Sequence, residues 1–290
     1  MIANIFLYGS VNGIILMLSA LGFSLVFGLS GIANLAHGGL YILAGYIAWM
    51  LLNYLNLPFF LSIAGSLIIV PLCGALIYRL IILPVRGITF SEIIATYAAL
   101  VAIVEFFRWM GFVTYEFALP PFIEGSVDIA GATLDYQRVF IIVIGVFLLL
   151  FLWIFTHHTK YGLALRAIAQ EEYTALSVGI DSDWAATISM ALGGALAAVA
   201  AIAILPLGII HVNLGYNVLL IALAVTVLGG MESIAGLVVA SFLLGYAQVF
   251  VSTFLGTQWV EVVYLLTIIV ILAIKPSGLF GKFQELEERV

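Results

Sequence analysis

Charge is scarce in this sequence. Only 8% of its 290 residues are Asp, Glu, Lys or Arg, and 65% are hydrophobic, whereas soluble domains carry about 25% charged and about 45–50% apolar residues. This deficit excludes an ordinary soluble enzyme. Nine basic residues stand against fifteen acidic ones, so the net charge is −6, which argues against nucleic acid as a partner.

Residues for metal binding, disulfide bonding and ATP binding are also missing. The one cysteine, Cys73, allows no disulfide and no cysteine-based metal site within a single chain. No lysine closes a GxxxxGKS or GxxxxGKT loop, so the chain has no P-loop of its own for ATP. We therefore expect no enzyme activity, no catalytic residues and no cofactor in this chain.

Ionisable residues inside the apolar runs are few. Glu92 and Glu105 lie near opposite ends of one run, and Glu261 lies near the start of the last. Glu105 precedes Arg108 by three residues, a spacing that favours an ion pair on a helix. None of these residues is placed as a midplane proton or sodium site, which a stand-alone transporter usually needs.

Long apolar runs dominate what is present. A membrane-spanning helix needs about 20 mostly apolar residues, and the sequence predicts an all-α, polytopic membrane protein with about nine such segments. Eight to ten spans are compatible with the pattern, because the second segment is short and almost nothing separates the seventh from the eighth. The predicted segments are 5–28, 36–53, 59–83, 91–111, 139–156, 184–207, 215–231, 234–254 and 259–274.

The distribution of Lys and Arg predicts the orientation. With nine spans and the N-terminus outside, the cytoplasmic side holds seven basic residues and the outside only two, in line with the positive-inside rule. The C-terminus is then cytoplasmic, and the polar stretches 113–138 and 157–183 lie outside and inside, respectively. The seven cytoplasmic residues are Arg79, Arg86, Lys160, Arg166, Lys275, Lys282 and Arg289, and the two outside are Arg108 and Arg138.

Two glycine-rich segments resemble one another. Gly28–Tyr46 and Leu228–Tyr246 each combine the end of an apolar run, a glycine-rich turn and a second run that ends in Gly-Tyr. Both have the same direction in the predicted threading, which is compatible with a parallel internal repeat. Chance clustering of the 28 glycines explains the similarity equally well.

The first of these segments predicts a break between two helices. Gly31 and Gly38 allow close approach of helix backbones, and Asn34 and His37 are expected to satisfy backbone groups that the break leaves free. One interpretation is a packing corner, and the other is a gate for substrate or a metal role for His37. The pattern does not decide between them.

The cytoplasmic stretch 160–183 predicts a short amphipathic helix. Residues 163–176 are rich in helix formers, and Gly179 follows them as an expected C-cap. Such a helix is either a solvated connector or a knob that docks into a groove of a cytoplasmic partner.

Four motifs in order resemble the LivH-type permeases of branched-chain amino acid ABC importers. The run Phe27–Tyr46 is similar to their GxxGxxNFAHG segment, with Leu35 where phenylalanine is usual. The loop Tyr161–Ile180 is similar to their coupling motif. VLGGMESIAG (227–236) is similar to VLGGxGSxxG, with Glu232 in place of a glycine, and KPSGLFGK (275–282) matches the terminal motif.

The resemblance implies two groups of site residues. The first is a helix that couples the chain to an ATPase, expected at 169–180, and the second is a helix-break or gate motif. The residues of the coupling helix are Arg166, Ala169, Glu171, Glu172, Ala175 and Gly179. The residues of the helix-break or gate motif are Gly31, Asn34, His37, Gly38, Gly229, Gly230 and Gly236.

The resemblance also implies partners and a location. The whole chain, 1–290, is then one permease domain in a bacterial or archaeal plasma membrane. Its partners are a second, LivM-type permease, two cytoplasmic ATPases and an extracytoplasmic substrate-binding protein. Related permeases for urea and short amides share these motifs, so the substrate stays open. A stand-alone transporter or channel and a scaffold subunit remain as rival hypotheses.

Overall fold

The computed structural model describes residues 2–113, 117–129, 132–231 and 233–281, and the chain is almost entirely helical there. Nine helices coincide with the nine predicted apolar segments. They are α1 (Ile2–Ser30), α2 (His37–Asn53), α3 (Phe59–Ile77), α4 (Thr89–Trp109), α5 (Tyr136–His158), α8 (Ser182–Ile204), α9 (Leu214–Gly229), α10 (Ile234–Phe254) and α11 (Val260–Ile274).

Shorter elements connect these helices. A π-helical turn, η1 (Tyr78–Ile82), and a 3₁₀ turn, η2 (Leu83–Val85), extend α3. Two short helices, α6 (Lys160–Gln170) and α7 (Glu172–Ser177), follow α5, and 3₁₀ turns η3 (Leu205–Leu207) and η4 (Thr257–Trp259) follow α8 and α10. Strands β1 (Ser126–Ile129) and β2 (Ala132–Asp135) form an antiparallel hairpin that pairs Ser126 with Asp135.

Length and composition separate the nine helices into two classes. Seven are long and apolar enough to cross a membrane, with α11 counted together with η4 as Thr257–Ile274, 18 residues. The other two are α2, with 17 residues, and α9, with 16. These two correspond to the second and seventh predicted segments, which were the sources of doubt about the number of spans. The all-α, polytopic fold is confirmed, whereas the count of nine spans stays a prediction.

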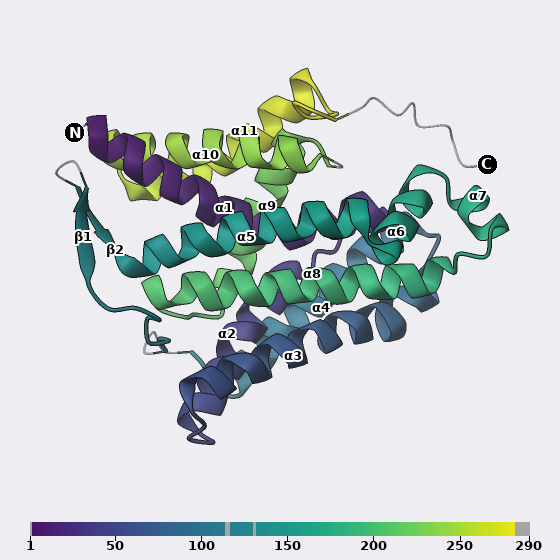
Figure 1. The fold of residues 1–290 in the computed structure, drawn as a ribbon, viewed down its shortest axis with the longest axis horizontal. Coiled ribbons are helices and arrows are strands. Elements are labelled where there is room, and N and C mark those ends of the chain that lie inside the picture. The colour runs from purple at the N-terminus through teal and green to yellow at the C-terminus, as the bar shows by residue number, and fades with distance from the viewer. Residues whose placement is uncertain (1, 114–116, 130–131, 232, 282–290) are drawn as a thin grey trace.

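The two ends of the molecule carry different elements. The N-terminal part of α1 and the β1–β2 hairpin lie at one end of the long axis, and α6 and α7 lie at the other (Figure 1). The predicted threading separates the same segments onto two sides of a membrane. The structure therefore agrees with the relative placement of the loops, and which end is cytoplasmic stays a prediction.

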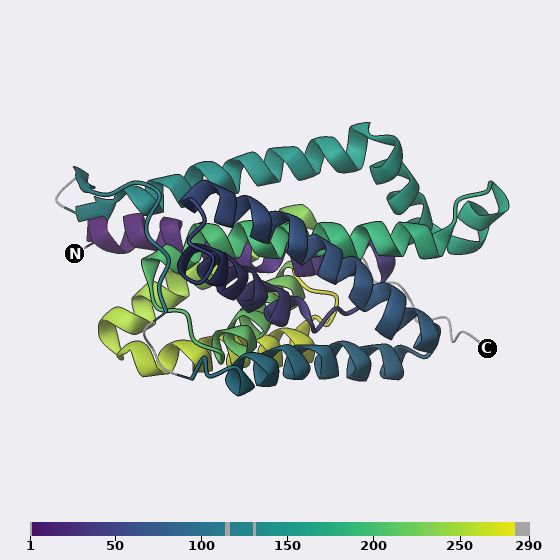
Figure 2. The ribbon, with the colours of Figure 1, turned by 90° about the horizontal axis from the view of Figure 1, so that it is seen from below.

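The most buried spans are α1 and α8, and the least buried is α11. In Figure 2, α5 and α4 run along opposite edges of the molecule, with α8 and α2 between them. Small residues allow the central helices to approach closely: a Cβ on Gly74 of α3 would lie 2.6 Å from the backbone oxygen of Met190 in α8. Such small-residue contacts are typical of helix packing in membranes.

The expected ion pair on α4 is present. The Arg108 guanidinium donates to the Glu105 carboxylate at 2.6 Å, and both side chains are exposed. The same guanidinium donates to Asn213 Oδ1 at 3.3 Å. The parallel repeat stays a prediction, because what its two segments share is a helix–connection–helix order, with a connection that begins at Gly31 in one and at Gly230 in the other.

Candidate functional site

The chain turns sharply after α1, as the glycine-rich sequence predicts. Gly31 has a φ of +67°, a left-handed conformation that favours glycine, and its N–H donates to the Phe27 carbonyl. Residues 31–36 are not helical, and α2 begins at His37. We call Gly31, Asn34, His37 and Gly38 the glycine corner.

The two polar residues of the glycine corner are completely buried but differ in their contacts. His37 Nε2 lies 2.8 Å from the backbone oxygen of Ser19 in α1. Neither polar atom of the Asn34 side chain has a hydrogen-bond partner in the described part of the chain. His37 therefore contacts the middle of α1 and not a backbone group that the break leaves free, and the Asn34 amide contacts no described group. The expectation that these two side chains satisfy the groups freed by the break is not confirmed.

Gly38 provides the closest backbone approach in the glycine corner. A Cβ at this position would collide with the backbone carbonyl of Gly215, and it would lie 3.3 Å from Leu219 Cβ. Gly38 is the second residue of α2, and Gly215 is the second residue of α9. The first turns of the two short helices therefore pack directly against each other.

Burial lowers the pKa of His211, in the connection before α9, which favours a neutral imidazole there.

The second glycine group, Gly229, Gly230 and Gly236, lies at the other end of α9. A Cβ on Gly229 would lie 2.6 Å from the Gly236 carbonyl oxygen. Gly230 has a φ of +102°. From Gly215 to Gly229 a helix rises about 20 Å, so the two glycine groups do not form one site. Grouping them as one gate motif was wrong, because they pack opposite ends of the same helix. Glu232 lies outside the described residues.

The C-terminal motif packs on the second glycine group. The N–H groups of Leu279 and Phe280 donate to the carbonyls of Leu228 and Gly229 at 2.8 and 3.1 Å. Two sequence motifs about 45 residues apart thus meet at one end of α9. Lys282, the last residue of the terminal motif, lies outside the described residues.

The predicted coupling helix is not continuous. Glu171 has φ −157° and ψ 96°, which ends α6 and precedes α7, so a single helix over 163–176 was wrong. The two pieces pack on different neighbours: α6 contacts α5, α1 and α8, whereas α7 contacts α6 and α8. We call residues 160–180 the coupling segment.

The end of α7 has the expected glycine. Gly179 has a φ of +85°, its N–H donates to Leu176, and the Ile180 N–H donates to Ala175. These two bonds form a Schellman motif. The prediction that Gly179 terminates this helix is confirmed, and the chain turns from there into α8.

Side chains of α7 divide into an inner and an outer set. Ala175, one of the residues expected to couple the chain to an ATPase, is only 3% exposed and packs inside the chain. The outer side carries Tyr173 and Val178, which are 82% and 74% exposed, and Leu176. The surface available to a partner is therefore apolar and aromatic. Glu171 is exposed, and the side chain of Glu172 lies outside the described part.

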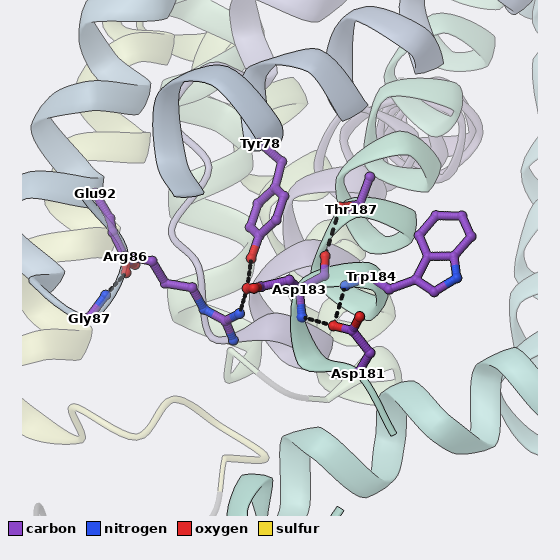
Figure 3. A network of polar contacts seen from close by, with 8 residues as sticks. All are labelled: Tyr78, Arg86, Gly87, Glu92, Asp181, Asp183, Trp184 and Thr187. Atoms are coloured by element: carbon purple, nitrogen blue, oxygen red, sulfur yellow. Dashed lines mark hydrogen bonds and ion pairs between the residues drawn. The ribbon is translucent and has the colours of Figure 1, made fainter. Parts of the chain in front are cut away.

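A polar junction, which the sequence did not predict, joins the first turn of α8, just after the coupling segment, to the chain that follows α3 (Figure 3). Asp183, in the first turn of α8, accepts a hydrogen bond from the Tyr78 hydroxyl at 3.0 Å and forms an ion pair with Arg86. Asp181 caps α8 by accepting from the N–H groups of Asp183 and Trp184 at 2.9 and 3.0 Å. The start of α8, into which the coupling segment leads, is therefore held to the region after α3.

The π-helical turn η1 contains Tyr78, and π-turns within helices occur frequently at functional sites. On the other side of Arg86, the Gly87 N–H donates to Glu92 at 2.8 Å. The only sequence signal for this junction was one acid and one base on the same predicted side of the membrane. That signal does not identify which residues pair.

Replacing Tyr78 with phenylalanine tests the junction. We expect the free energy of unfolding to fall by about 1 kcal/mol, because one partly buried hydrogen bond is lost, and the melting temperature of the purified full chain to fall by about 2 °C. Tyr97→Phe is the matched control, because the exposed Tyr97 hydroxyl makes no hydrogen bond with a described residue. Equal melting temperatures for the two variants would contradict a stabilising junction.

Comparison with known proteins gives one consistent result. Residues 5–272 match the family described as branched-chain amino acid transport system / permease component. The chain is 28% identical to the high-affinity branched-chain amino acid transport system permease protein BraD of Pseudomonas aeruginosa, over 91% of both chains. It is also 28% identical to the corresponding protein LivH of Salmonella typhimurium, over 96% of both.

A more distant relative and a solved structure agree with this. A probable branched-chain amino acid transport permease protein LivH of Methanocaldococcus jannaschii is 26% identical, over 92% of this chain and 89% of that one. The structure described as PsaBC from Streptococcus pneumoniae in complex with Fab has a TM-score of 0.52 and 14% identity, over 97% of this chain and 98% of the other. At that identity the likeness shows a shared fold alone.

Proposed function

This chain belongs to the family of branched-chain amino acid transport system permease components, and from that premise we propose that it forms the translocation path of an ABC importer for branched-chain amino acids. Separate ATPase subunits would drive the import. The family and the seven long apolar helices make it a multi-pass membrane protein. We place it in the plasma membrane of a bacterium or archaeon.

The observation that carries the proposal is the form of the coupling segment. It projects at the end of the molecule opposite the N-terminus (Figure 1), and its α7 exposes Tyr173, Leu176 and Val178. Large exposed apolar side chains on a short protruding helix suit a protein partner. α7 packs on α6 and α8, and the junction of Tyr78, Arg86 and Asp183 ties the first turn of α8 to η1 and to the connection before α4, so that movement of the partner would reach the spans.

Three kinds of partner follow from the proposal. Two ATPases would bind on the cytoplasmic side, one of them at α7 of the coupling segment. A second, LivM-type permease would complete the path, and an extracytoplasmic protein would deliver the substrate. Apolar side chains on α3 and α4, such as Phe60 and Phe90, are strongly exposed. Such faces suit contact with lipid or with the second permease.

Reconstitution tests the function and the substrate together. The chain would be purified with the ATPases, second permease and binding protein that neighbouring genes encode, and placed in liposomes loaded with ATP. We expect ATP-dependent uptake of leucine and valine. Uptake of urea or acetamide instead would assign the alternative substrate class. Leucine uptake by this chain alone, driven by an ion gradient, would overturn the proposal in favour of a stand-alone transporter.

Cysteine labelling tests the proposed orientation. In a Cys73→Ala background, a cysteine replacing Ser126 of β1 should react with an impermeant maleimide in intact cells, and one replacing Ser177 of α7 should react only after lysis. Both positions are exposed, whereas Ser182, at the start of α8, is too buried to report. The seven-to-two excess of basic residues is the physical reason for the expected result. Labelling of position 177 from outside would reverse the orientation.

A further inference from the structure

A cavity of about 550 Å³ lies beside the coupling segment. Its walls come from the end of α1, the end of α5, α6, the first turn of α10 and the C-terminal segment at Phe280 and Gly281. Its volume falls within the range of about 300–1,000 Å³ that small-molecule sites occupy. Arg166 and Ala169 of the expected coupling helix line it, and no ligand has been assigned to it so far.

Three polar side chains in the cavity have no partner. The Arg166 guanidinium, the Gln170 amide and the Ser24 hydroxyl form no hydrogen bond or ion pair with any residue that the structure describes. Ser24 is only 7% exposed, so a hydroxyl in a confined place is left for a ligand. Gln170 is exposed and Arg166 is half-buried, so water solvates these groups when no ligand is bound.

The other polar residues of the cavity are already engaged. The Thr156 hydroxyl donates to the Leu152 carbonyl at 2.8 Å. His157 Nδ1 lies 2.9 Å from the Trp153 carbonyl, and the Ser233 hydroxyl accepts from the Gly236 N–H at 3.0 Å. The side chains of the cavity that have no protein partner at all are therefore one cation, one amide and one hydroxyl.

The available groups and the apolar wall match one class of molecule. A guanidinium binds a carboxylate with two parallel hydrogen bonds. The Gln170 and Ser24 oxygens can accept from an ammonium, and the wall formed by Leu25, Leu29, Ile234 and Phe280 suits a branched apolar side chain. We propose that this cavity binds a free zwitterionic, apolar amino acid on the side of the membrane that holds α6, and that binding there inhibits transport.

Inhibition follows from the place of the cavity. A ligand in it would contact α6 together with α1 and α10, and α6 leads directly into α7, which we propose binds the ATPase. A ligand that favours one arrangement of two elements shifts the equilibrium toward that arrangement. The accumulated product would then hold the coupling segment in place and slow further import. This inference rests on the proposed function, because it takes the transported amino acid as the ligand.

The test uses the complete transporter in liposomes loaded with ATP and millimolar leucine. We expect the loaded leucine to lower the initial rate of ATP hydrolysis about fivefold or more in the wild type. For Arg166→Gln and Ser24→Ala the inhibition should fall below about twofold. The inhibition of each variant is the ratio of its rates of ATP hydrolysis without and with internal leucine. Lys160→Gln is the matched control, because Lys160 is an exposed cation of the same helix that does not line the cavity.

Two results would overturn the inference. Equal inhibition by internal acetate would show an adventitious anion site only, and equal inhibition of wild type and both cavity variants would place the effect elsewhere. A second measurement separates this inference from the proposed function: binding of radiolabelled leucine to the purified complex without ATP. If the complex does not transport leucine, the proposed function fails. The cavity site is overturned if the complex does not bind leucine, or if the Arg166→Gln complex binds leucine as well as the wild type does.

Discussion

Gly38→Leu is expected to abolish assembly of a transport-competent protein, and Gly38→Ala is expected to be almost as severe. Any Cβ at this position collides with the backbone carbonyl of Gly215, and a backbone atom cannot move aside as a flexible side chain can. Overpacking a core usually costs about 1–3 kcal/mol, and here the first turns of α2 and α9 must separate as well. The measurement is the yield of monodisperse full-length protein, with leucine uptake of the reconstituted complex.

Gly208→Ala is the matched control for this prediction. Gly208 lies in the connection that leads to α9, and a Cβ there would meet no atom within 4 Å. Its φ of −157° is an extended conformation that alanine also adopts. We expect this variant to keep normal yield and uptake. Normal yield and uptake for Gly38→Leu would refute the close packing of α2 on α9.

Much of the fold could be predicted because spanning a membrane is a local property of the sequence. The predicted segment 139–156 became α5, Tyr136–His158, since an apolar run of that length forms its hydrogen bonds within itself. The prediction that Gly179 ends a helix was correct for a similar reason, because a helix end that needs a left-handed residue favours glycine. The packing contacts between these helices could not be predicted in this way. That Gly38 lies against Gly215, far away in the sequence, depends on how all the helices pack.

The coupling segment shows where local propensity was insufficient. Residues 163–176 are good helix formers, yet the chain breaks at Glu171. Leu165 and Ala175 are both buried, and a straight helix would place residues ten apart about 80° from each other around its axis. The break lets α6 pack on α5 and α1 while α7 packs on α8. Ala175 faces the interior because α7 packs on α8 in this arrangement. The sequence alone did not predict the arrangement.

Tyr173→Ala is expected to lower leucine uptake to below about a tenth of the wild-type rate. Tyr173 is the most exposed large side chain of the coupling segment, and truncating an aromatic residue at the centre of an interface often costs about 2 kcal/mol or more. We expect the ATPase subunits to be lost on purification through this chain, while the chain itself inserts normally. Val178→Asp should act in the same direction, because it places a carboxylate in the apolar contact.

Tyr161→Ala is the matched control. Tyr161 is 63% exposed and belongs to α6, so it loses the same aromatic ring outside the proposed contact on α7. We expect this variant to retain ATPase binding and most of the uptake. If Tyr173→Ala instead keeps its ATPase subunits and its uptake, the coupling segment is a solvated connector.

Ala175→Arg distinguishes a partner contact from a structural role within the same helix. Because Ala175 is buried inside the chain, arginine there must displace α7 or bury its charge, and burying a charge is costly. We expect Ala175→Arg to lower the melting temperature of the purified chain as well as the uptake, whereas Tyr173→Ala should lower uptake without changing the melting temperature. A fall in melting temperature for both variants would mean that Tyr173 supports the fold, and the contact with the ATPase would then have to lie elsewhere.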